Sequence, residues 1–173
     1  MKHRVPNKAR GMSLLEVIIA STILTVVVSS VTILMRTGRD AWQANSDDQA
    51  RLEAAHATVR HVVRRVRQAT SVIAISSASD TSGTISVLME TGEIYVWNHD
   101  SGSDEVHFGV TSASSLLGEN VTQLKFTGYE ADATTASTTV SDIQAIKIEA
   151  QISLPRETSG TKTITSWAWI RTW

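Results

Sequence analysis

The sequence predicts an α+β fold, in which a long N-terminal helix packs on an antiparallel β-sheet head. Residues 17–35 form a run of nineteen residues without a charge. Residues 52–69 carry apolar side chains at alternating spacings of three and four, the period of a helix with one buried face. Residues 146–154 alternate between apolar and polar side chains, the pattern of a half-buried strand.

The first part of the predicted helix, residues 12–35, is long enough to cross a membrane, which takes roughly 20 apolar residues. Glu16 lies one turn inside its start. An acidic side chain there costs free energy, of order 3 kcal/mol at a helix centre and less near an end. We therefore expect Glu16 to have a partner and a function. The alternative is an interfacial acid whose carboxylate reaches the lipid headgroups.

Residues 36–70 are expected to continue the helix as an amphipathic segment. One apolar stripe runs along it, which we call the seam: Leu52, Ala55, Val59, Val62, Val66 and Ala69. Gly38 weakens the helix locally, and Ser46 with Gln49 could form a capping box where a helix restarts. We expect one long helix that ends at Ala69, with 38–48 as the place for a kink or a local loosening.

Residues 71–173 are expected to form the β-rich head. A hairpin is predicted from 84–89 and 93–97, joined by a Glu-Thr-Gly turn, and the remaining predicted strands are 105–108, 121–126, 146–154 and 162–173. The last two are expected to pair through a loop that contains Pro155 and Gly160. The strands together predict an antiparallel sheet laid on the seam.

The N-terminal residues 1–11 carry four basic side chains and no acidic one: Lys2, Arg4, Lys8 and Arg10. This bias predicts a single-pass protein whose N-terminus stays in the cytoplasm while the head crosses the membrane. A secretory signal peptide cleaved near Ser30 and an uncleaved membrane anchor are the alternatives. The signal peptide gives no reason for Glu16.

Composition argues against several function classes. The chain has 173 residues, a net charge of −1 and no cysteine. Without the four basic residues of 1–11 the net charge is −5, so no nucleic-acid partner is expected. The sequence has no nucleophile elbow, no HExxH motif and no phosphate-binding glycine loop, so we expect neither an enzyme nor a cofactor. Residues 98–107 hold two histidines and three acids but match no metal-binding spacing, which favours a polar hairpin loop over a metal site.

Two groups of residues are candidates for docking a partner. Arg60, Arg64 and Arg67 share one helix face, which could bind acidic groups of another subunit or could be only a solvated face. Trp167, Trp169 and Trp173 share one face of the last predicted strand, opposite Ile164, Ala168 and Ile170. These tryptophans could pack in the core or mark an interface, where tryptophan is enriched.

Residues 11–16 read Gly-Met-Ser-Leu-Leu-Glu, after a basic leader and before a long apolar run. This arrangement resembles the processing site of the type IV pilin superfamily. The resemblance implies that a membrane peptidase removes the leader 1–11 by cutting after Gly11 and methylates the new amine of Met12. It also implies that Glu16 pairs with that amine on a neighbouring subunit during assembly. The family more often has Phe as its first mature residue.

Residues 64–69, Arg-Arg-Val-Arg-Gln-Ala, and residues 120–126 resemble the J-type minor pseudopilins of type II secretion systems. That resemblance implies a structural subunit of the bacterial inner membrane, with an extracytoplasmic head. Its implied partners are other pilins or pseudopilins, the prepilin peptidase, the inner-membrane assembly platform and membrane lipid. The alternatives are a minor pilin of a type IV pilus, serving adhesion or DNA uptake, and a single-pass anchored binding domain.

Overall fold

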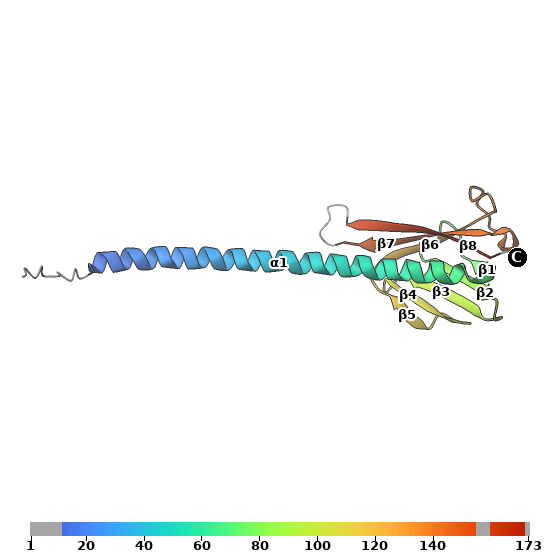
Figure 1. The fold of residues 1–173 in the computed structure, drawn as a ribbon, viewed down its shortest axis with the longest axis horizontal. Helices are drawn as coiled ribbons and strands as arrows, with labels where there is room; N and C mark the ends of the chain where they lie inside the picture. The colour runs from blue at the N-terminus through green and yellow to red at the C-terminus, as the bar shows by residue number, and fades with distance from the viewer. Residues whose placement is uncertain (1–11, 155–159, 172–173) are drawn as a thin grey trace, which may run out of the picture. The chain divides into compact units, whose positions relative to one another are not determined.

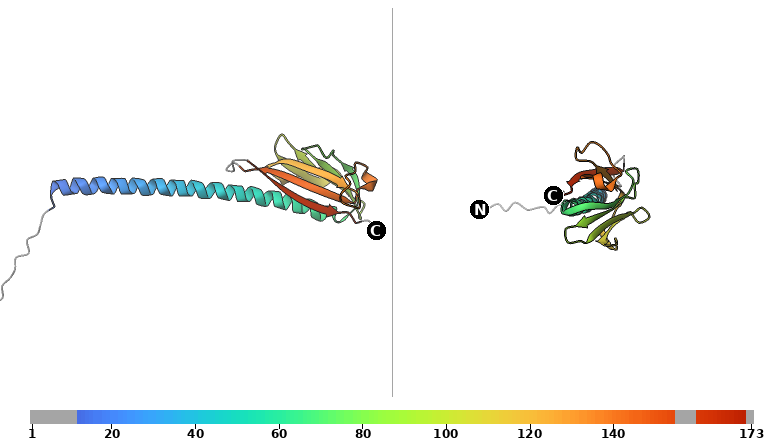
Figure 2. Two further views of the ribbon diagram at one scale, coloured as in Figure 1. Left: turned by 90° about the horizontal axis from the view of Figure 1, so that it is seen from above. Right: turned by 90° about the vertical axis from the view of Figure 1, so that its right-hand side faces the viewer.

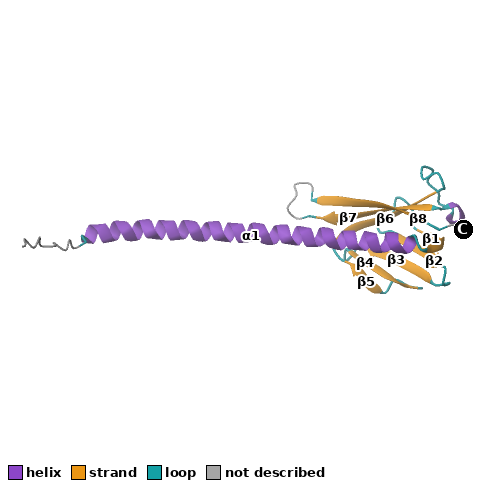
Figure 3. Cartoon of the chain, in the orientation of Figure 1, coloured by secondary structure: helices purple, strands orange, loops and turns teal. Residues whose placement is uncertain are grey.

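The structure is a computed structural model that describes residues 12–154 and 160–171. The chain divides into two compact units, Met1–Ala44 and Asn45–Trp173, and each is described by itself. The helix α1, Leu14–Val66, begins in the first unit and ends in the second (Figure 1). All the β-strands belong to the second unit (Figure 3).

The helix α1 has 53 residues and is continuous through Gly38 and Ser46. The prediction of one long helix is therefore confirmed, and the helix does not restart at Ser46. One glycine costs a helix only about 1 kcal/mol, which is too little to interrupt a long cooperative helix. The helix ends at Val66 and not at Ala69, because Ala69 already belongs to the first strand.

Hydroxyl groups within the apolar part of α1 donate back to carbonyls of the preceding turn. Thr25 bonds the Ser21 carbonyl, Ser30 bonds Val26 and Thr32 bonds Val28, each at 2.8 Å. Such bonds satisfy polar side chains without water. This part of the helix is therefore chemically suited to an apolar environment.

The second unit contains two antiparallel sheets. The larger has the order β1-β2-β3-β4-β5 and the smaller β6-β7-β8. Their bounds are β1 Ala69–Ile75, β2 Thr84–Met89, β3 Ile94–Asp100, β4 Glu105–Val110, β5 Ser115–Gly118, β6 Val121–Tyr129, β7 Ala145–Ser153 and β8 Thr161–Trp169, and a short 3₁₀ helix, η1, spans Val140–Asp142.

The predicted α+β class is confirmed, and so are the β2–β3 hairpin and the pairing of β7 with β8. The prediction of one sheet is corrected to two. Two strands were not predicted, β1 and β5. β1 has register shifts and exposes Ile73, so its sequence shows no clean alternation, and β5 has only four residues.

The seam of α1 lies in the core of the second unit, as predicted. Ala55, Val59, Val62 and Val66 are buried, and Leu52 packs against the same core at its edge. The core also contains side chains of both sheets: Ile85, Val87, Trp97, Val106, Leu124, Phe126, Ile146, Ile148 and Ile152. In Figure 2 the end of α1 is seen end-on, flanked by strands of both sheets. One helix therefore supplies apolar surface to two sheets at once.

The helix α1 lies very close to Gly118, the last residue of β5. A Cβ atom added to Gly118 would collide with Oγ1 of the buried Thr58. Thr58 Oγ1 donates to the Ala54 carbonyl at 3.0 Å, which holds the side chain in place. A glycine at this position thus lets β5 lie against the helix.

We expect Gly118→Ala to lower the free energy of unfolding by about 1–3 kcal/mol through overpacking. Thr58→Ala removes the atom that the new methyl group meets, so the double variant should recover part of that loss. Urea unfolding of the four proteins of this cycle measures the coupling between the two positions. If the changes in unfolding free energy of the two single variants simply add, the contact between Thr58 and Gly118 does not determine how close β5 lies to α1.

An aromatic cluster joins α1 to the larger sheet. The Trp97 indole donates from Nε1 to His61 Nδ1 at 3.3 Å, and the His61 ring meets Phe108 edge-on with centroids 4.7 Å apart. Burial, together with the positive charges of Arg65 and Arg64, lowers the pKa of His61 below 6.5. Protonation would also remove the acceptor that Trp97 uses.

The lowered pKa of His61 predicts that the head loses stability in mild acid. The unfolded state takes up the proton at higher pH than the folded state, so stability falls as the pH drops below about 6.5. Urea unfolding followed by tryptophan fluorescence at about pH 7.5 and about pH 5.5 measures the loss. His61→Gln should reduce this pH dependence, and the exposed His56→Gln should keep it. An unchanged dependence in His61→Gln would contradict the assignment.

Candidate functional site

The first residues of α1 form a helix cap around Glu16. The Ser13 backbone N–H donates to Glu16 Oε2 at 3.3 Å, and the Val17 N–H donates to the Ser13 carbonyl at 3.2 Å. Ser13 is thus the N-cap residue, and Glu16, three residues later, reaches back as the acid of a capping box does. Negative charge in the first turn also interacts favourably with the helix dipole. Met12 is exposed, and Gly11 lies outside the described residues.

The apolar part of α1 exposes large side chains on all its faces. They range from 48% exposed at Val31 to 79% at Leu14, and consecutive residues such as Val26, Val27 and Val28 are all more than half exposed. Successive residues point about 100° apart, so the apolar surface surrounds the helix. In the part of the chain that the structure describes, α1 is the one helix long and apolar enough to cross a membrane.

Trp42 is a candidate residue for the end of the membrane-spanning segment, and the sequence analysis missed it. Its side chain is 79% exposed, and it follows the apolar run after Arg36 and Arg39. Tryptophan is enriched where a transmembrane helix leaves the hydrocarbon core. The signal in the sequence was the aromatic residue seven positions after Met35.

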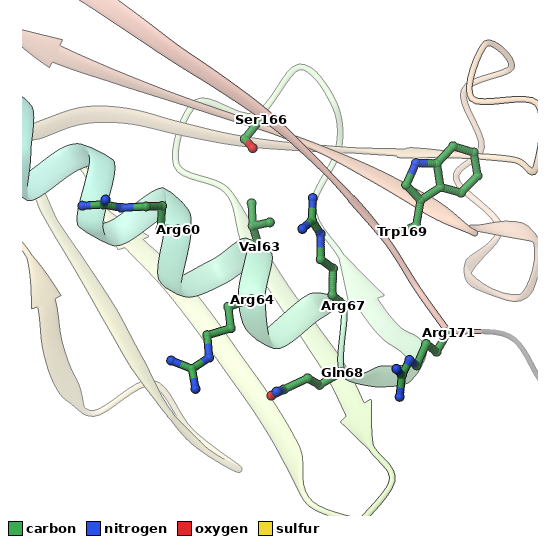
Figure 4. A pocket seen from close by; sticks show the side chains of 8 residues that line it. All are labelled: Arg60, Val63, Arg64, Arg67, Gln68, Ser166, Trp169 and Arg171. Carbon is green, nitrogen blue, oxygen red and sulfur yellow. The ribbon is translucent and has the colours of Figure 1, made fainter.

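A groove of about 730 Å³ lies between the end of α1 and β8 (Figure 4). The residues that line it are Arg60, Val63, Arg64, Arg67, Gln68, Ser166, Trp169 and Arg171. The structure therefore brings together Arg60, Arg64, Arg67 and Trp169, which the sequence analysis singled out separately. Arg171 was not among the candidates, because it reaches the groove only where the fold brings the end of β8 beside the end of α1.

The other two candidate tryptophans lie differently. Trp167 lies beside the groove, where its carbonyl accepts a bond of 3.5 Å from the Arg67 guanidinium, and its ring packs on Tyr129 at 4.8 Å. Trp167 and Trp169 are 36% and 48% exposed, while Ile164, Ala168 and Ile170 are buried. At these described residues the strand alternates as predicted, and Trp167 and Trp169 are on the open face. Trp173 lies outside the described residues.

The predicted loop 98–107 is mostly strand. Asn98, His99 and Asp100 end β3, and β4 begins at Glu105, so only residues 101–104 connect the two. His99 is 2% exposed, with Nε2 2.6 Å from the Val121 carbonyl and Nδ1 3.2 Å from Ser82 Oγ. These contacts make His99 a link between the two sheets. Over residues 12–154 and 160–171, no cluster of three or more His, Asp or Glu side chains could hold a metal.

Residues 6–32 match the family model of the prokaryotic N-terminal methylation motif. No curated protein and no solved structure matches the chain. The motif is the prepilin-processing signature of type IV pilins and pseudopilins, and it coincides with the start and the apolar part of α1. The predicted resemblance to this superfamily is thus confirmed. The chain therefore carries the prepilin-processing signature of type IV pilin-like proteins, and its helix α1 is long and apolar enough to cross a membrane.

Proposed function

We propose that this protein is a minor pseudopilin of a type II secretion-like system. The leader 1–11 is removed by cleavage after Gly11, the new amine of Met12 is methylated, and the subunit assembles with others through α1. The strongest support is that three features occur together at the start of α1. They are the methylation motif at 6–32, the acid in the first turn of the helix and the exposed apolar surface that follows it.

Glu16 is the residue that we assign to assembly. Cleavage creates a positively charged amine at Met12, because an α-amino group titrates near pH 8. In an apolar environment the attraction between this amine on one subunit and Glu16 on the next is much stronger than in water. The Ser13 N–H already bonds one carboxylate oxygen, and a carboxylate can accept further bonds. The pair would fix the axial position of one subunit against its neighbour.

The remaining parts of the proposal concern place and partners. The basic residues of 1–11 favour a cytoplasmic N-terminus, so the head would face the extracytoplasmic side of the bacterial inner membrane. The proposed segments are the leader 1–11, the membrane and assembly helix 12–35, its amphipathic continuation 36–70 and the head 71–173. The partners are other pilins or pseudopilins, the prepilin peptidase, the assembly platform and membrane lipid.

The choice of a secretion system over a type IV pilus rests on the resemblance of residues 64–69 and 120–126 to the J-type subunits. Residues 64 and 65 lie in the last turn of α1, and 121–126 belong to β6. Both segments contribute buried side chains to the head, Val66 and Phe126 among them. The resemblance therefore concerns the packing of the head as well as its surface.

The intact mass of the membrane-extracted protein tests processing. In cells with an active prepilin peptidase, we expect loss of residues 1–11 and the addition of one methyl group. The same cells without the peptidase should yield the full-length chain. A full-length chain in both strains, with a control prepilin processed, would support the anchored-domain alternative, and cleavage near Ser30 would support a signal peptide.

Substitutions of Glu16 separate its charge from its capping bond. Glu16→Gln keeps an oxygen for the Ser13 N–H but has no charge, and Glu16→Ala has neither. Breaking a buried ion pair costs about 3–5 kcal/mol, so we expect both variants to be processed but to co-purify with neighbouring subunits at least ~100-fold less. Glu53→Gln, an exposed acid in the second unit, is the matched control. Normal assembly of Glu16→Gln would show that only the cap matters.

A further inference from the structure

The groove between α1 and β8 concentrates positive charge in a protein that is otherwise acidic. Three arginines of one helix face line it, Arg60, Arg64 and Arg67, and none of its lining residues is acidic. Arginine stays protonated at all physiological pH values. Like charges three or four residues apart destabilise a helix slightly, so this face is more stable when an anionic group neutralises it.

The other wall of the groove is the outer edge of a sheet. β8 is the last strand in the order β6-β7-β8. On its inner side the Ile170 N–H bonds the Gln144 carbonyl, while the Trp167 carbonyl is reached from the outer side by Arg67. Backbone groups of alternate residues point to alternate sides of a strand. Thr165 and Trp169 therefore direct their N–H and C=O groups to the same edge as Trp167.

An outer strand edge is a template on which another extended chain can pair. The contact of Arg67 with Trp167 is long, at 3.5 Å, so an incoming strand can replace it at little cost. The volume of about 730 Å³ lies within the range of ligand pockets, roughly 300–1,000 Å³, and exceeds what a single ion needs.

The apolar residues of the groove narrow the chemistry of its occupant. Trp169 is 48% exposed at the β8 side, and Val63 lies between the arginines on the α1 side. Tryptophan and arginine are the residue types most enriched among those that dominate binding energy at interfaces. An occupant with acidic side chains alone would leave the indole uncovered. A segment in which acidic and apolar residues alternate fits both.

We propose that this groove binds an extended acidic segment of a partner protein, which adds as a strand to the outer edge of β8 and pairs its carboxylates with Arg60, Arg64 and Arg67. The groove lies within the second unit, so this inference does not depend on cleavage at Gly11 or on Glu16.

Binding of a synthetic peptide to the full-length protein in detergent tests the proposal. The probe is a labelled peptide of about seven residues that alternates glutamate with valine or threonine, and its binding is followed by fluorescence anisotropy. Arg64→Gln should weaken binding about ten-fold, because the binding free energy lost with one charge-assisted hydrogen bond corresponds to about that change in affinity. Lys162→Gln, which removes the same charge from β8 outside the groove, should bind as the unchanged protein does.

Two further peptides test the mode of binding. The same peptide with lysine in place of glutamate should not bind, and the glutamate peptide with N-methylated alternate amides should bind at least about ten-fold more weakly, because it cannot pair along an edge. Bound peptide should also slow hydrogen exchange of the Trp167 and Trp169 amides. Near-ultraviolet circular dichroism confirms that Arg64→Gln is folded.

Three results would overturn the proposal. Equal affinity of Arg64→Gln and Lys162→Gln would show that the arginine face does not bind the peptide. Equal affinity of the N-methylated peptide would show attraction by charge without strand addition. Self-association that Arg64→Gln abolishes, without any peptide binding, would assign the groove to a second copy of this chain.

Discussion

The seam of α1 is the contact on which the second unit depends. Neither sheet closes on itself, and each has one face that must be covered by apolar side chains. Ala55, Val59, Val62 and Val66 provide that cover for both sheets. Because these side chains are small, strands can approach the helix closely, as β5 does where Gly118 meets Thr58. The packing of each sheet against the seam of α1 therefore determines where that sheet lies in the second unit.

The two parts of the helix differ in their surface, and each surface suits a different environment. Between Val17 and Met35 apolar side chains surround the helix, and its hydroxyl groups bond to its own carbonyls. From Leu52 onward only one stripe is apolar, and the opposite face carries charge. A fully apolar surface suits lipid, and a single stripe suits a protein core. The change in pattern is what assigns a membrane role to one part and a packing role to the other.

Local patterns accounted for the predictable parts of the fold. The seam and the alternation in β7 each follow from a period that a short stretch of sequence displays. The division into two sheets does not, because it depends on which strand edges pair, and β1 and β5 lack a clear period. The groove was half predictable, because the arginine face was visible in the sequence. Trp169 and Arg171 come about 100 residues after these arginines, and only the fold brings them to the groove.

In the assembly role proposed for it, Glu16 would serve a subunit both before and after assembly. In the single chain its carboxylate accepts the Ser13 N–H, which would otherwise be one of the unpaired donors at a helix start. This bond lowers the cost of placing an acid beside an apolar run before any neighbour is present. The bond uses one oxygen, so the carboxylate keeps capacity for a cation. A cap within the subunit and an ion pair between subunits are therefore compatible, and the first holds the acid in the first turn, where the second would form.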